Sequence, residues 1–219
     1  MTSQLFTAEI QQGIENAIIY LLNNNQLMNY NTINSPRAVG DAVQNFLERN
    51  IYQCLPNDLV TKIDTSFARR SMADLAFEDI NHNYYVVDIK THNRNTAFNM
   101  PNITSVERLA RFYEDNKNYF VVLFVSYITL QDQLHFEKCF FIPIEYLDWS
   151  CLTLGALGWG QIQIANSNHL NVALTNTRKK WMLQLCNALD IFYPNEIIKI
   201  NHRIDHFRKV RYYWENQPD

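Results

Sequence analysis

The sequence has no apolar run that approaches the roughly 20 residues needed by a membrane-spanning helix. Its beginning lacks the basic start and the apolar centre of a secretory signal peptide. We therefore expect a cytoplasmic protein without a membrane partner. Glycine is scarce, with 5 in 219 residues. The absence of a glycine-rich phosphate loop and of any nucleotide-binding motif argues against a small-molecule phosphatase.

Cysteine is also scarce, and the four cysteines form neither a Cys-x-x-Cys pair nor a Cys/His pattern with zinc spacing. Free thiols are expected in the cytoplasm. The formal net charge of -3 neither supports nor excludes a nucleic-acid partner, because phosphate contacts depend on local charge and an acidic catalytic cleft lowers the total.

The length and the 47% hydrophobic content are sufficient for one sizeable core, so we predict a single domain over residues 1–219. Residues 1–35 carry an N-terminal helix, which could serve dimerisation or simply belong to the core. Residues 36–175 form the expected catalytic and DNA-reading core. Residues 176–219 are expected to form two helices, the second beginning at Pro194.

The centre of the prediction is the segment 84–91, where every second residue is apolar. This alternation predicts a strand with one buried face, and it leaves Asp88 and Lys90 together on the other face, about 6.6 Å apart along the strand. Asp74 belongs to a second apolar run, and the residues 81–83 between the runs favour a turn. The resulting hairpin would bring Asp74 beside Asp88.

Two facing carboxylates repel each other unless a cation lies between them, and Mg²⁺ suits a site built from oxygen ligands. A lysine beside that ion can orient or activate a water molecule. Asp74, Asp88 and Lys90 therefore have the chemistry of phosphodiester cleavage. The alternative is that they are merely charges on an exposed strand.

An acid followed by a gap and an acid-any-Lys triplet resembles the PD-(D/E)XK nucleases. Further blocks in the same order resemble the HincII-like type II restriction endonucleases, namely residues 100–103 after an asparagine-rich link, the Gln-Ile-Gln run at 161–163, and residues 176–181. The resemblance implies an α/β fold with the restriction-endonuclease-like core, in which a mixed central β-sheet is flanked by helices.

The resemblance also implies a type II site-specific deoxyribonuclease. Such an enzyme hydrolyses double-stranded DNA at a palindromic site with Mg²⁺, as a homodimer with one active site per strand, and it leaves blunt ends with 5′-phosphates. By this resemblance Asp74, Asp88 and the backbone carbonyl of Ile89 hold the Mg²⁺, Lys90 acts on the attacking water, and Thr91 donates to a phosphate oxygen.

Two segments are candidates for reading DNA. Asparagines in the link 92–102 can pair with adenine in the major groove, and apolar side chains there can wedge between base steps. In the segment 161–165 glutamine alternates with isoleucine, as in a strand that faces a groove. The DNA-binding residues that we predict are Thr91, Asn93, Arg94, Asn99, Met100, Asn102, Gln161 and Gln163.

Other interpretations remain open at this point. A repair or structure-specific nuclease could share the catalytic core, and a DNA-binding module could lack cleavage, although a module of that kind has no need for two facing acids. Asp41 could reach the metal site from the helix that begins at Pro36, but a solvated first-turn acid explains it more simply. His202 and His206 have metal spacing without the glutamate of a zinc hydrolase, so we prefer a basic or solvated helix face.

Overall fold

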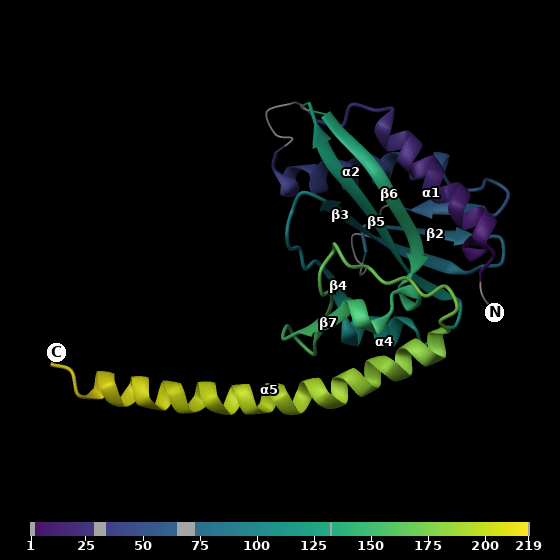
Figure 1. Ribbon diagram of the computed structural model, residues 1–219. Helices are drawn as coiled ribbons and strands as arrows, with labels where there is room; N and C mark the ends of the chain where they lie inside the picture. The colour runs from purple at the N-terminus through teal and green to yellow at the C-terminus, as the bar shows by residue number, and fades with distance from the viewer. Residues whose placement is uncertain (1–2, 29–33, 65–72, 132, 219) are drawn as a thin grey trace. The chain divides into compact units, whose positions relative to one another are not determined.

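The computed structural model describes residues 3–28, 34–64, 73–131 and 133–218. Residues 1–175 form one compact unit and residues 176–219 form a second. The boundary between the two units falls after residue 175, and the single domain over residues 1–219 stays a prediction. The first unit is a mixed α/β structure, as predicted at the level of the α/β class, and it carries all the predicted catalytic residues; the restriction-endonuclease-like core stays a prediction (Figure 1).

The first unit is built around a mixed sheet of five strands in the order β1-β2-β3-β5-β6. Its strands are β1 (Val60–Asp64), β2 (Leu75–Asp79), β3 (Tyr84–Asn93), β5 (Asn118–Leu130) and β6 (Gln133–Pro143). The pair β3 and β5 is parallel and the other neighbours are antiparallel. Pro143 ends β6 at the edge of the sheet, where a residue without an N–H group is tolerated.

The predicted hairpin is confirmed as β2 and β3, with Leu75 opposite Val87. Its turn is held by Asp79, whose carboxylate accepts the backbone N–H groups of Asn81 and Asn83. His82 adopts the left-handed conformation with φ 57°. Side-chain bonds to the backbone two and four residues later are typical of aspartate in tight turns, so the local sequence explains this connection.

The expectation of an open polar face on β3 is wrong. Asp88 is only 5% exposed and Val86 only 1%. The reason is the position of β3 in the middle of the sheet, where it pairs with β2 and with β5 and also contacts helix α2 (Pro36–Asn50). A strand that is covered on both faces does not alternate between buried and exposed residues as a half-exposed strand does.

Two helices cover the sheet. In α1 (Ala8–Asn23) the residues Ile14, Ile18 and Leu22 form a buried stripe, and the helix packs against β6 (Figure 1). This packing makes α1 a core helix of its own chain. Ser35 caps α2 by accepting a bond from the N–H of Ala38, and Pro36 occupies the first turn, as the sequence predicts.

Three further strands of the first unit form a smaller antiparallel sheet in the order β4-β8-β7. Its strands are β4 (Asn102–Ser105), β8 (Gln161–Ile164) and β7 (Leu152–Gly155). Helix α4 (Val106–Phe112) follows β4 directly. The short 3-10 helices are η1 (Gln4–Phe6), η2 (Ile51–Gln53), η3 (Ile144–Tyr146) and η4 (Trp149–Cys151).

The second unit consists of one helix, α5 (Arg178–Glu215), which begins after the cap residue Thr177. The predicted break at Pro194 is wrong, because the helix continues through this residue. A proline costs an interior helix one backbone bond and a steric clash, and long helix-forming segments on both sides can carry that cost. Among the described residues, none of the helices combines the length and the apolar character that a membrane span requires.

Candidate active site

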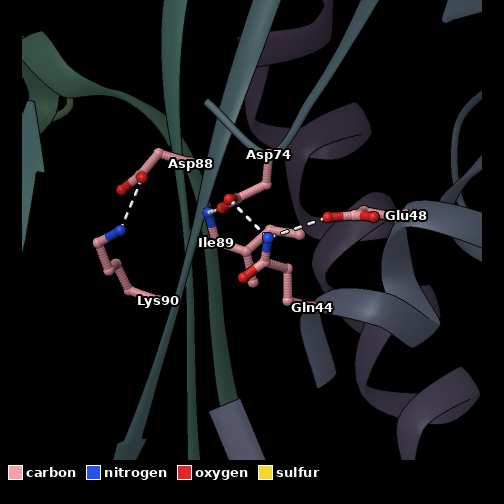
Figure 2. Close-up of polar contacts among 6 residues, drawn as sticks. All are labelled: Gln44, Glu48, Asp74, Asp88, Ile89 and Lys90. Carbon is pink, nitrogen blue, oxygen red and sulfur yellow. Dashed lines mark hydrogen bonds and ion pairs between the residues drawn. The ribbon is translucent and has the colours of Figure 1, made fainter. Parts of the chain in front are cut away.

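Asp74 lies at the start of β2 and is fixed by three bonds. Its N–H donates to the carbonyl of Val87 at 3.0 Å. Its Oδ2 accepts the N–H of Ile89 at 2.6 Å, and its Oδ1 accepts Nε2 of Gln44 at 2.8 Å (Figure 2). The regular register of the hairpin ends at the pair of Leu75 with Val87, and the bond from Asp74 to Val87 departs from it, so Asp74 lies just beyond the last regular pair.

Asp88 and Lys90 form the second half of the site, on one face of β3. Lys90 Nζ lies 2.6 Å from Asp88 Oδ1, while Asp88 Oδ2 is buried and has no hydrogen-bond partner (Figure 2). Burial raises the pKa of Asp88 to about 7; the ammonium of Lys90 opposes this rise and the carboxylate of Asp74 adds to it. Burial thus outweighs the ion pair at this carboxylate.

The surroundings of Asp74 introduce two residues that the sequence interpretation missed. Burial raises the pKa of Asp74, the nearby Glu48 adds to this rise, and the N–H of Ile89 and the charge of Lys90 oppose it. Gln44 bridges the two acids, because its Nε2 also donates to Glu48 at 2.9 Å (Figure 2). The acid of α2 whose charge acts on Asp74 is therefore Glu48, two turns beyond Asp41. The i, i+4 spacing of Gln44 and Glu48 was the available signal.

The donor set has the chemistry of a hard-cation site. Asp88 offers a buried oxygen that has no partner, and Asp74 offers a second carboxylate. Because the N–H and C=O of one strand residue point to the same edge, the carbonyl of Ile89 faces the edge occupied by Asp74. These oxygen ligands fit Mg²⁺. In the described part of the chain, no three His, Cys, Asp or Glu side chains already converge on one point, and this includes His202 and His206.

A pocket of about 370 Å³ opens beside Lys90. The N-terminal turns of α2 form one wall, with Arg37 and Gly40, and the end of β3 forms another, with Thr91 and Asn93; Asp41 and Asn99 also line it. A Cβ atom at Gly40 would lie 3.2 Å from Thr91 Oγ1, so glycine allows the close approach of helix and strand. The structure thus gathers four predicted site residues, Lys90, Thr91, Asn93 and Asn99, around one cavity.

Three further predicted DNA-binding residues lie on the small sheet. Gln163 on β8 pairs with Asn102 on β4, and its Nε2 donates to Oδ1 of Asn102 at 2.6 Å. Gln161 lies on the same strand, opposite Gly155 of β7. A Cβ atom at Gly155 would lie 2.7 Å from Gln163 Oε1, so the side chain of Gln163 needs a glycine there.

The last two predicted DNA-binding residues lie on the segment between these groups. Arg94 is exposed and forms an ion pair with Glu137 of β6. Met100 is 42% exposed. An exposed ion pair contributes little to stability, so Arg94 can exchange Glu137 for another anion at low cost.

No protein-family model matches this sequence, and a search of curated proteins gives no significant relative. The interpretation of the site therefore rests on the residues and their geometry.

Proposed function

We propose that this protein is a Mg²⁺-dependent endonuclease that cleaves double-stranded DNA. The observation that carries the proposal is the β2–β3 hairpin, where the charges of half-buried Asp74, buried Asp88 and Lys90 act on one another and Lys90 lines an open pocket. Burying two carboxylates with raised pKa values is costly for a protein that uses them only for structure. Acids with shifted pKa values next to a cleft are typical of catalytic sites, and here Lys90 connects Asp88 to the pocket, which neither Asp74 nor Asp88 lines.

Asp74, Asp88 and the carbonyl of Ile89 would hold the ion. Bound Mg²⁺ would supply positive charge where negative charge develops on the phosphate and on the leaving 3′ oxygen. Lys90 is part-buried, with its side chain 19% exposed, and its ammonium is oriented by Asp88. From that position Lys90 would hold the attacking water by a hydrogen bond and stabilise the negative charge that develops on its oxygen as it attacks phosphorus and its proton passes to solvent.

The pocket favours a DNA phosphate. The N-terminal turns of α2 contribute partial positive charge, and Thr91 contributes a hydroxyl donor. Arg37 and Lys90 contribute two cationic side chains against one acid in the lining, Asp41, although Lys90 also pairs with Asp88. The paired amides of Asn102 and Gln163 carry the donors and acceptors that read base edges, and the exposed Met100 can wedge between base steps.

The finer proposal is a type II restriction endonuclease. A palindromic target read by one kind of chain calls for two copies related by a two-fold axis, hence a homodimer with one active site for each DNA strand. We propose cleavage to blunt ends with 5′-phosphates. A repair or structure-specific nuclease is the alternative with the same core, and a DNA-binding module without cleavage is the alternative from another class.

The test is digestion of plasmid and phage DNA with and without Mg²⁺, using the wild type, Lys90→Ala and Lys117→Ala. Lys117 is a matched control because it adjoins Tyr84, at the opposite end of β3 from Lys90. We expect discrete Mg²⁺-dependent bands from the wild type and from the control. Lys90→Ala should lose at least a hundredfold in rate and keep most of its DNA binding, since general acid–base groups contribute about 10²–10⁴-fold.

Three results would contradict parts of this proposal. A smear in place of bands would indicate a non-specific or repair nuclease. No cleavage with retained binding would indicate the DNA-binding module. Equal loss of cleavage and binding in Lys90→Ala would show that Lys90 does not act in the chemical step.

A further inference from the structure

The second half of α5 carries a regular stripe of large apolar side chains. Its members are Tyr193, Ile197, Ile200, Ile204, Phe207 and Trp214. They follow one another at alternating intervals of four and three residues, with Arg211 at the one polar position. All six are exposed, from 40% at Tyr193 to 67% at Trp214. This spacing is the heptad repeat of a coiled coil, in which such a stripe forms the seam between two helices.

We propose that α5 pairs with α5 of a second copy of this chain along this stripe, with the two helices antiparallel. The opposite face of the helix is mainly polar, with Lys199, His202, His206 and Lys209, although Ile198, Tyr212 and Tyr213 are also exposed outside the stripe. A continuous apolar stripe beside a mainly polar face suits one partner helix rather than burial on all sides. An identical helix is the partner that offers a stripe with the same spacing.

The exposed area is sufficient for such a pair. At about half exposure each of these side chains offers on the order of 100 Å². Six from each copy together offer roughly 1,200 Å², which is the lower limit of a specific, stable interface. Leaving this area in water would be unusual, because contiguous apolar patches of that size on soluble proteins are generally interaction sites.

The charges on the helix decide its orientation. Equivalent positions meet in a parallel pair, so Arg211 would face Arg211 of the second copy. An antiparallel register that superposes the run from Tyr193 to Arg211 on itself sets Ile197 against Phe207 of the second copy and leaves Trp214 at the end of the seam, beside Asp190 of the second copy. It also sets Arg211 against Tyr193 of the second copy and one turn from its Asp190, which provides a cation–π contact and an opposite charge.

Two ion pairs form within α5 and involve none of the residues of the apolar stripe. Lys199 pairs with Glu196 at 2.7 Å and Arg208 pairs with Asp205 at 2.9 Å, both within the same helix. Arg203 borders the seam in either orientation, and its long side chain can keep its charge in water. The pairing specifies the homodimer of the proposed function, on which it builds, but its test does not involve cleavage. Cleavage and molar mass are measured separately, so a failure of the pairing can be distinguished from a failure of the nuclease proposal.

The test compares molar masses by light scattering or sedimentation equilibrium over a concentration series. The wild type should have twice the 25.9 kDa mass of one chain. The double variant Ile200→Glu and Ile204→Glu should have the mass of one chain. Ile198→Glu is the matched control, because Ile198 is 53% exposed, close to the 47% of Ile200, but lies beside the stripe. It should remain a dimer. Circular dichroism checks that every variant is folded.

Cross-linking tests the orientation. In a Cys186→Ser background, a mixture of Ile197→Cys and Phe207→Cys proteins should form a disulfide between the two kinds of chain. Either variant alone should not cross-link, whereas a parallel pair would link each to itself. A wild type with the mass of one chain, a double variant that remains dimeric, equal dissociation by Ile198→Glu, or self-linking of the single variants would overturn the proposal.

Discussion

Replacing Asp88 by asparagine should make the metal-free protein more stable while abolishing the proposed cleavage of DNA. The carboxylate is 5% exposed and one of its oxygens has no partner, so the folded chain carries an incompletely compensated negative charge. Asparagine has nearly the same shape and no charge. Catalytic residues commonly reduce stability in this way, because they are selected for chemistry rather than for the fold.

The sign and size follow from the pKa. Burial raises the pKa of Asp88 from 3.8 to about 7, so the folded protein holds this proton more tightly than the unfolded chain. The wild type is therefore favoured at acidic pH and loses free energy of unfolding as the pH rises from about 4 to about 7. A shift of about three units corresponds to at most ~4 kcal/mol. This shift already contains the attraction of Lys90. The new amide brings N–H donors into a buried site and costs free energy where they stay unpaired, so we expect a net gain of roughly 1–3 kcal/mol at pH 8.

The assay is urea unfolding in EDTA at pH 4.5 and at pH 8, with Asp58→Asn as a control, since Asp58 is exposed. We expect the stability difference between Asp88→Asn and the wild type to be small at pH 4.5 and large at pH 8. Adding Mg²⁺ at pH 8 should raise the melting temperature of the wild type but not of Asp88→Asn. A variant equal to or less stable than the wild type at pH 8 would refute the reasoning.

Two further substitutions test other parts of the structure. Tyr85→Phe removes a hydroxyl, in a fully buried side chain, that lies 2.7 Å from Asp79 Oδ2 and 2.5 Å from Ser3 Oγ; urea unfolding should show a loss of about 1–3 kcal/mol, and an unchanged midpoint would contradict this. Gly155→Ala should displace Gln163 from Asn102, because the new Cβ would lie 2.7 Å from Gln163 Oε1. We expect weaker binding to specific DNA with little change in melting temperature, and unaltered DNA binding would exclude Gln163 as a reader.

Local sequence determined the hairpin and the helix starts. Alternating apolar residues, the turn built on Asp79, and the Ser35-Pro36 cap act over a few residues, so each could be inferred without knowledge of the rest of the chain. The spacing that sets Asp88 and Lys90 on one face of β3 is likewise a property of any strand. Asp74, Asp88 and Lys90 were accordingly predictable as neighbours.

Burial and the contacts between distant segments were decided by the tertiary structure. The central position of β3 buries Asp88 and shifts its pKa, and no pattern within the strand itself indicates that position. The approach of α2 brings Gln44 and Glu48 to Asp74, across a gap of 30 residues for Gln44. The pairing of β4 with β8 joins Asn102 to Gln163 across 61 residues.

The continuity of α5 through Pro194 is another case in which the local sequence did not decide the structure. A proline predicts a helix start from its own geometry, but the outcome depends on the helical segments before and after it. The sequence by itself therefore determined which residues carry the proposed chemistry and on which local elements they lie. The tertiary structure decided which of them meet and how strongly their charges are perturbed, because burial and long-range contacts arise only when the sheet assembles.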